Sequence, residues 1–238
     1  MKISDIVVDE LTSLNERERV KHKNRTPGVF YPSESMQCQR KIYISVIHPE
    51  RKKEKMPLGL FHMAKFAEES VIKCVQSKPG LCVQEQVRLE REIAPDVIIH
   101  GYIDFELLDD DGYPTHVYEI KSIGNLSYME KATEAKIHHR AQLQCYLQTV
   151  NCNKGGIIYV ERGDIGKIKQ FDDSKDEKLW TDIKKHFSEL SEYMRDAQLP
   201  PPVPCADWEC KYCEFADGCK EERKKKGIKS TTVWENLC

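Results

Sequence analysis

The chain has 238 residues, enough for one large domain or for one domain with an appendage. A charged fraction of 32% and a hydrophobic fraction of 39% are typical of a folded globular protein and exclude a disordered chain. The net charge of -2 indicates no particular partner. No stretch reaches the roughly 20 apolar residues of a membrane span, so we expect a cytoplasmic protein.

Apolar periodicity along the chain predicts a mixed α/β domain, in which helices flank a sheet. Spacing of three and four residues favours helices, whereas alternation and β-branched residues favour strands. Asp109 to Gly112 form a turn signal, which makes a hairpin of the strands on either side. In chain order we expect a helix over 56–77, a strand over 82–89, the hairpin strands 97–108 and 117–120, a helix over 129–150, strands over 156–160 and 167–171, and a helix over 179–194 that ends at the prolines of 200–204.

Two acidic residues and a lysine on the predicted hairpin are candidates for a metal site. Asp104 lies on the first strand, and Glu119 and Lys121 lie on the second. Paired strands are about 4.8 Å apart, so the two carboxylates can converge on one cation if the register allows it. Carboxylate oxygens bind Mg or Mn, and a nearby ammonium can steady an attacking water in phosphodiester hydrolysis. The alternative for Glu119 and Lys121 is an exposed salt bridge with no catalytic role.

Ten cysteines in a reducing compartment suggest metal ligation rather than disulfides. Cys205, Cys210, Cys213 and Cys219 form the densest group, and by spacing alone they would suit a tetrahedral zinc ion. The remaining cysteines have no spacing partner, and we interpret them as buried or incidental thiols: Cys74, Cys82, Cys145 and Cys152, with Cys238 at the end of the sequence.

The hairpin residues resemble two motifs of the RecB-type branch of the PD-(D/E)XK nucleases. Gln142 to Tyr146 resembles the Gln-x-x-x-Tyr motif of that branch, and Gly59 to His62 resembles its upstream histidine motif. The resemblance implies a restriction-endonuclease-like core. It also implies roles for individual residues: metal ligation by Asp104, Glu119, the Ile120 carbonyl and His62, activation of water by Lys121, and positioning of the DNA strand by Gln142 and Tyr146.

A further resemblance concerns the cysteines. Iron–sulfur members of the RecB-like group have one cysteine before the nuclease core and a Cys-x2-Cys-x5-Cys pattern after it. Cys38 lies in the upstream position, and Cys210, Cys213 and Cys219 match the downstream pattern. The resemblance implies an iron–sulfur cluster, with 4Fe–4S favoured over 2Fe–2S, that ties the two ends of the domain together. Whether Cys205 is also a ligand stays open.

Taken together, the motifs are most similar to a CRISPR-associated family of RecB-like exonucleases, over about residues 30–222. The resemblance implies exonuclease or endonuclease action on single-stranded DNA with Mg or Mn, and prespacer processing beside CRISPR integrase proteins. Two alternatives stay open: a recombination-repair nuclease outside CRISPR, and a non-catalytic DNA-binding scaffold with a structural zinc module. The expected organisation is a lead over 1–29, a nuclease domain over 30–199, an iron–sulfur module over 200–222 and a basic tail over 223–238.

Overall fold

A computed structural model of the protein describes residues 2–21, 25–49, 58–202 and 207–227. Its described strands form one mixed sheet in the order β1-β3-β4-β5-β6, and β2 pairs with β3 as well. The β1/β3 and β4/β5 pairs are parallel, and the β2/β3, β3/β4 and β5/β6 pairs are antiparallel. The strands are β1 (Val29–Phe30), β2 (Cys82–Ala94), β3 (Val97–Leu108), β4 (Pro114–Ile123), β5 (Lys154–Glu161) and β6 (Asp164–Ser174).

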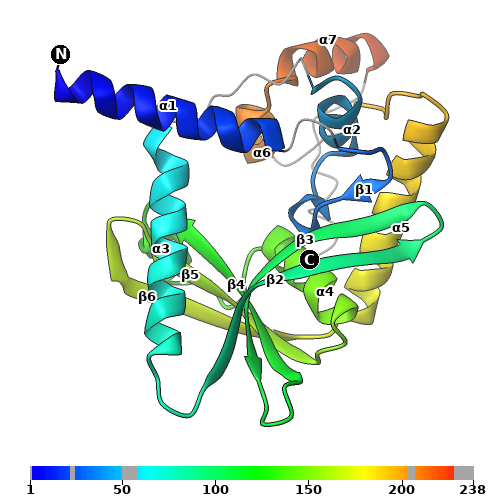
Figure 1. The fold of residues 1–238 in the computed structure, drawn as a ribbon. Helices are drawn as coiled ribbons and strands as arrows, with labels where there is room; N and C mark the ends of the chain where they lie inside the picture. The colour runs from blue at the N-terminus through cyan, green and yellow to red at the C-terminus, as the bar shows by residue number, and fades with distance from the viewer. Residues whose placement is uncertain (1, 22–24, 50–57, 203–206, 228–238) are drawn as a thin grey trace.

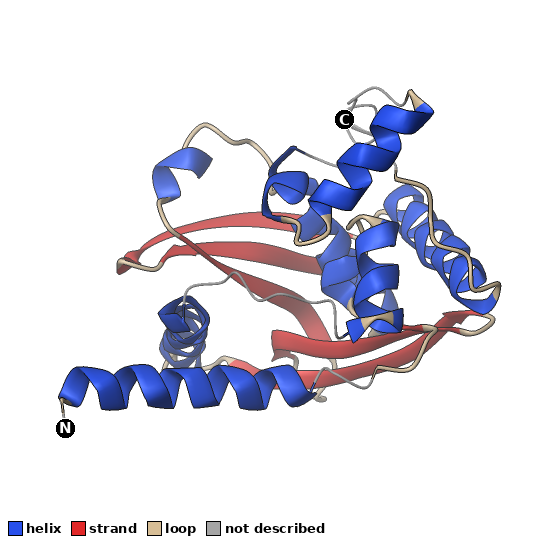
Figure 2. Cartoon of the chain, turned by 90° about the horizontal axis from the view of Figure 1, so that it is seen from above, coloured by secondary structure: helices blue, strands red, loops and turns tan. Residues whose placement is uncertain are grey.

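Helices flank this sheet, and α1 projects from the body of the molecule (Figures 1 and 2). Two short 3-10 turns, η1 and η3, precede α2 and α4. The helical elements are α1 (Ile3–Lys21), η1 (Pro32–Glu34), α2 (Gln39–Ile47), α3 (Leu58–Gln76), η3 (Leu126–Met129), α4 (Ile137–Thr149), α5 (Glu177–Arg195), α6 (Asp207–Tyr212) and α7 (Ala216–Lys226).

Two apolar clusters hold the layers together, one on each face of the sheet. On one face, Ala67 and Val71 of α3 pack with Ile120 of β4. On the other face, α4 and α5 form a larger cluster that includes Leu143 and Phe187. Neighbouring strand residues point to opposite faces, so β4 contributes side chains to both clusters. The sheet is therefore buried on both sides where β4 and β5 cross the molecule.

The expected strands and most of the expected helices are confirmed. β3 has the bounds that the alternation predicts, and the 56–77 and 179–194 predictions correspond to α3 and α5. The mixed α/β fold with a central sheet between helices is therefore the one expected from the sequence.

The helix predicted over 129–150 is wrong in its first part, because α4 begins at Ile137. The preceding segment is a loop whose carbonyl groups turn toward one ammonium. Lys169 Nζ donates to the carbonyls of Met129, Glu130 and Ala132 at 2.6, 2.9 and 3.0 Å. These carbonyls converge on a lysine in place of a continuous helical ladder, so the apolar spacing in this segment reflects loop packing.

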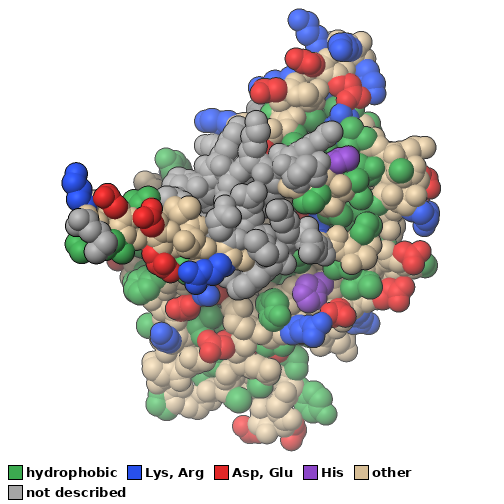
Figure 3. Space-filling model, turned by 45° about the horizontal axis from the view of Figure 1, so that its top comes forward, with side chains coloured by type: hydrophobic (Ala, Val, Ile, Leu, Met, Phe, Trp, Pro, Cys, Tyr) green, Lys and Arg blue, Asp and Glu red, His purple; other side chains and the backbone are tan. Residues whose placement is uncertain are grey.

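The ends of the chain contain helices that the sequence analysis did not predict. The expected lead includes α1, and its boundary at residue 29 falls in β1, while the boundary at 222 falls inside α7. The last turn of α7 is basic, but acidic side chains alternate with the basic ones on the part that projects at the top of Figure 3. This basic run is thus a mixed-charge face. Among the described residues, no helix combines the length and apolar character that a membrane crossing requires.

Candidate active site

The site forms where β3 and β4 separate. Their antiparallel register pairs Phe105 with Tyr118, so Asp104 and Glu119 are the next positions along the two strands. Beyond this point the Ile120 amide of β4 bonds to a side chain. It donates to Asp104 Oδ2 at 2.6 Å. The two predicted carboxylates are thus adjacent at the point of separation.

Burial and neighbouring negative charge define the electrostatics of Asp104. Burial, followed by the carboxylates of Glu119 and Glu68, raises the pKa of Asp104 well above its usual value. The Ile120 amide and Lys121 act in the opposite direction but do not offset this. A group of acids that suppress one another's ionisation is an environment that a cation would relieve.

A chain of hydrogen bonds links the hairpin to α4. Lys121 Nζ lies 2.5 Å from Glu119 Oε1 and donates to Gln142 Oε1 at 2.9 Å. Gln142 Nε2 then donates to the Tyr146 hydroxyl at 2.7 Å. The order of contacts is Glu119, Lys121, Gln142, Tyr146, and the four predicted residues meet in one network. Burial alone would lower the pKa of Lys121, yet the adjacent Glu119 leaves it raised, so the amine is held as an ammonium.

One oxygen of this network lacks a partner among the described residues. Glu119 is 3% exposed, and its Oε2 is buried with no hydrogen bond from the described part of the chain, while Oε1 contacts Lys121. A buried carboxylate oxygen without a donor is costly, which makes it suited to a ligand. The residues present therefore fit a hard divalent cation, although no three His, Cys, Asp or Glu side chains of the described chain already stand in a metal-holding arrangement.

Glu68 of α3 is a third acidic group that the sequence analysis missed. Burial, followed by the negative charge of Glu119, raises the pKa of Glu68. The positive charge of Lys121 lowers it, but by less. Its Oε1 accepts a hydrogen bond from Gln86 Nε2 at 2.8 Å. A signal was present in the sequence: Glu68 lies four residues after Ala64 and three before Val71, so it interrupts the apolar stripe of the helix.

His62, the predicted ligand on α3, has a different environment. Its ring contacts Phe61 edge-on, with 5.7 Å between centroids. Its Nε2 is buried and has no hydrogen-bond partner among the described residues. No described contact joins His62 to Asp104 or Glu119, and for Ile120 the described contact is made by the amide. Metal ligation by His62 and by the Ile120 carbonyl thus stays a prediction.

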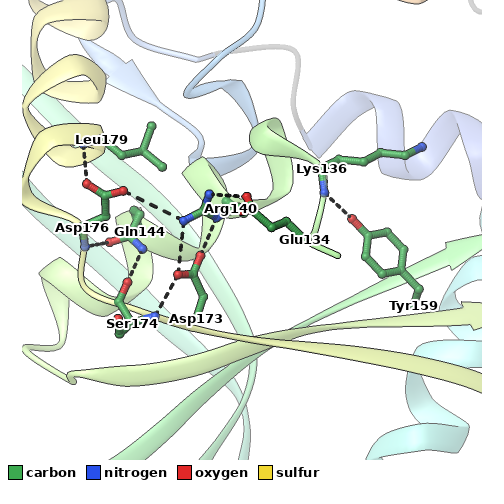
Figure 4. A network of polar contacts seen from close by, with 9 residues as sticks. All are labelled: Glu134, Lys136, Arg140, Gln144, Tyr159, Asp173, Ser174, Asp176 and Leu179. Atoms are coloured by element: carbon green, nitrogen blue, oxygen red, sulfur yellow. Dashed lines mark hydrogen bonds and ion pairs between the residues drawn. The ribbon is translucent and has the colours of Figure 1, made fainter. Parts of the chain in front are cut away.

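Contacts made by other residues of α4 and by the residue before it hold this helix in place, and with it Gln142 (Figure 4). Arg140 lies between Glu134 and Asp173, with N–O distances of 3.1 and 2.8 Å. At the start of the helix, the Tyr159 hydroxyl accepts from the Lys136 amide and lies 2.7 Å from His139 Nδ1. Tyr159 is also the register partner of Lys121. These contacts fix α4 to β5 and β6, and with it the side chains that meet Lys121.

The predicted cysteine ligands that the structure describes lie together. Cys38, Cys210, Cys213 and Cys219 line one small cavity beside α2, α6 and α7. The Cys38 amide donates to Glu209 Oε1 at 2.8 Å, which joins α2 to α6.

The chemical state of these cysteines differs from one to another. Burial raises the pKa of the Cys38 and Cys213 thiols, and Cys210 takes part in a disulfide. The cavity has the expected residue set, but Cys210 could serve as a ligand only after reduction. Cys205 lies outside the described residues.

The comparison with known families agrees with this fold. The sequence model of the PD-(D/E)XK nuclease superfamily matches residues 32–220. Because this range covers most of the chain, the protein belongs to the PD-(D/E)XK nuclease superfamily. Membership of this superfamily supports a metal-dependent, hydrolytic nuclease. No curated protein matches the chain significantly.

Solved structures share the fold at low sequence identity. The crystal structure of SSO0001 superposes with a TM-score of 0.66 and 21% identity, covering 91% of this chain and 97% of that one. An alkaline exonuclease from Laribacter hongkongensis gives a TM-score of 0.56 and 11% identity, covering 76% and 93%. The same exonuclease in complex with dAMP gives 0.55 and 12%, covering 72% and 90%. At these identities the likeness concerns the fold alone.

Proposed function

We propose that this protein is a metal-dependent DNA nuclease that hydrolyses phosphodiester bonds at the junction of β3, β4 and α4. The observation that carries the proposal is the buried Oε2 of Glu119, which accepts no hydrogen bond from any described residue and lies next to Asp104 and Lys121. Superfamily membership supports the reaction class. A neighbouring fold that was solved with dAMP is consistent with a nucleic-acid substrate.

Each residue of the network has a role in this proposal. Asp104 and Glu119 would hold Mg or Mn, with the Ile120 carbonyl and His62 as further candidate ligands. The bound ion would polarise the phosphoryl group and lower the pKa of a water molecule. The Lys121 ammonium would orient that water and offset developing negative charge. Gln142 and Tyr146 would fix Lys121 from α4 and position the DNA strand.

Replacement of Lys121 tests this assignment. Lys121→Ala should lower cleavage of end-labelled DNA by roughly 100-fold to 1000-fold, because it removes a charge aimed at the reacting phosphate. Cleavage is measured with Mg and with Mn on single-stranded and double-stranded substrates.

The matched control is Lys167→Ala. Lys167 is an exposed lysine of β6 that pairs with Glu161 at 3.2 Å, and no described contact joins it to Asp104 or Glu119. The Lys167→Ala variant should cleave DNA at the wild-type rate. Wild-type cleavage by Lys121→Ala would contradict the catalytic role.

A second part of the proposal concerns the cysteines. We infer that Cys38, Cys210, Cys213 and Cys219 hold an iron–sulfur cluster, with 4Fe–4S favoured, once the Cys210 disulfide is reduced. Support comes from the one cavity that all four line. A zinc ion in the same cavity is the alternative. Anaerobic purification distinguishes them: a cluster gives a brown protein with visible absorption and iron content, which Cys213→Ser should remove, whereas zinc leaves the protein colourless.

The biological setting is proposed from the resemblance alone. Exonuclease action on single-stranded DNA and prespacer processing with CRISPR integrase proteins follow from it, and a repair nuclease has the same chemistry. Assays with 5′-labelled and 3′-labelled strands would establish polarity. Co-purification with integrase proteins would favour the CRISPR setting, and its absence the repair setting.

A further inference from the structure

A row of aromatic side chains begins beside the candidate active site, on one face of the β2/β3 hairpin. Tyr102 lies two residues before Asp104 on β3, and His100 lies two residues before Tyr102. Strand alternation places the three side chains on the same face, with Tyr102 about 7 Å and His100 about 14 Å from Asp104 along the strand. This part of the hairpin runs from the centre of the sheet toward α5 (Figure 1).

The face that carries Tyr102 is open to solvent. The residues on either side of Tyr102 face the protein, because Ile103 is buried and a Cβ built on Gly101 would lie 3.0 Å from Pro32 Cδ. Tyr102 itself is 51% exposed. One exposed ring would need no explanation, so the side chains around it decide what this face can bind.

The neighbouring rings contact one another. His100 meets Tyr102 edge-on, with 6.1 Å between ring centroids, and Tyr31 lies against His100 with 6.4 Å between centroids. The Arg25 guanidinium lies 4.7 Å from the centre of the Tyr31 ring, so the row ends at a positive charge. We call Tyr102, His100 and Tyr31 the aromatic row.

Arg88 adds a second positive charge, directly beside Tyr102. The register of β2 and β3 pairs Arg88 with Tyr102, and two residues further along it pairs Glu90 with His100. Glu90 Oε2 lies 2.5 Å from Arg88 Nη2 and 3.2 Å from His100 Nδ1. Glu90 thus holds a guanidinium that is 64% exposed next to the rings. Surfaces that combine aromatic rings with basic side chains bind unpaired nucleic-acid strands, since bases stack on the rings and phosphates meet the cations.

We propose that the aromatic row is a stacking track for unpaired bases of the DNA strand that enters the candidate active site, with Tyr102 as the ring nearest the phosphate that is cut. The inference rests on the proposed function and deepens it, because it assigns where the bases of the substrate bind and which side chain binds them. Stacking on a ring tolerates any base but requires that the base be unpaired. The track therefore favours a single strand or a frayed end over a closed duplex.

DNA binding measured without a divalent metal tests the track separately from cleavage. A fluorescein-labelled single strand, and the same strand built from abasic nucleotides, are titrated with the full-length protein in EDTA and followed by fluorescence anisotropy. Tyr102→Ala should weaken binding of the strand with bases by about 5-fold to 150-fold, the range for the loss of one stacked base. Binding of the abasic strand should stay at the wild-type level, because that strand offers phosphates and no bases.

Two further variants separate stacking from a structural role. Tyr102→Phe keeps the ring and should bind both strands with wild-type affinity. Tyr113→Ala is the matched control, since Tyr113 is a tyrosine that is 70% exposed in the turn between β3 and β4. It should leave both affinities unchanged. Urea denaturation of each variant shows that the compared proteins are folded.

The possible results distinguish this inference from the proposed function. Wild-type affinity of Tyr102→Ala for the strand with bases would overturn the track, even where Lys121→Ala abolishes cleavage. An equal loss on both strands, or a loss in Tyr102→Phe as large as that in Tyr102→Ala, would show that the ring does not act by stacking, and would overturn the track as well. A wild-type protein that neither binds nor cleaves DNA would overturn the proposed function and this inference together.

Discussion

At the scale of single residues, the site depends on the hydrogen bonds that orient Lys121. Lys121 is bonded on one side by Glu119 and on the other by Gln142, which in turn is bonded to Tyr146. Burial, with the negative charges of Glu119 and Asp104, raises the pKa of Tyr146, so its hydroxyl stays protonated. A neutral hydroxyl at this place can accept from Gln142 and fix the orientation of the amide.

Removal of that hydroxyl tests the network. Tyr146→Phe keeps the ring but leaves Gln142 Nε2 without its acceptor, so single-turnover cleavage should fall while the fold loses about 1–3 kcal/mol. Cleavage and urea denaturation are measured in parallel. Tyr128→Phe is the control, because Tyr128 is 83% exposed. Wild-type cleavage by Tyr146→Phe would show that the orientation of Gln142 does not matter.

Only some residues of the candidate site could be predicted from the sequence. Strand alternation brought Asp104, Glu119 and Lys121 together on the predicted hairpin. Gln142 and Tyr146 were predicted from the resemblance to the RecB-type branch. Glu68 and Gln86 were not, since their approach to the site depends on how α3 and β2 pack against β3. A charge inside an apolar stripe could have revealed Glu68, but no local pattern indicates the left-handed backbone of Gln86.

At the scale of elements, close contact between β4 and β5 holds β4 in place. Gly155 of β5 pairs with Val117 of β4. A Cβ built on Gly155 would lie 2.3 Å from the Val117 carbonyl oxygen and 3.2 Å from side-chain carbons of Leu143 and Leu147. The lack of a side chain at residue 155 thus lets β4 and α4 approach β5 together.

Alanine at this glycine should therefore be destabilising. We expect Gly155→Ala to lower the free energy of unfolding by about 1–3 kcal/mol, as overpacked cores do. Gly163→Ala is the control, since no described atom lies within 4 Å of a Cβ at that position. Thermal unfolding of both variants is the measurement, and equal midpoints would show that β4 and β5 can shift without cost.

Elements at the ends of the domain were harder to predict than the sheet. The strands follow from alternation, and α3 and α5 follow from long apolar stripes. α2 spans only nine residues, and α6 and α7 are stabilised by contacts with α2 rather than by apolar stripes of their own. Helices of this kind depend on tertiary packing, which a single sequence does not show.

At the scale of the whole molecule, buried neutral histidines make stability depend on pH. Burial lowers the pKa of His186 to about 4, of His138 to about 4 and of His139 to about 2. In the unfolded chain a histidine titrates near pH 6.5, so the unfolded state binds more protons below that pH. Stability is therefore fully present above about pH 6.5 and is lost as pH falls toward 4.

His186 is the residue with which to check this dependence, because it lies on α5 and is not one of the candidate site residues. Between pH 8 and pH 5 its protonation in the unfolded state should cost about 2 kcal/mol of stability. His186→Gln should reduce the loss over that range by this amount. Urea denaturation at each pH is the measurement, and an unchanged acid dependence would contradict the assignment.

The contacts of α2 with the last helices have a consequence for synthesis on the ribosome. Arg40 donates to the Pro200 carbonyl and pairs with Glu222, and the Cys38 amide donates to Glu209. All six strands are synthesised before residues 207–226. The helices that contact Cys38 and Arg40 are thus the last to be made, and the cysteine cavity cannot form until the end of the domain has been synthesised.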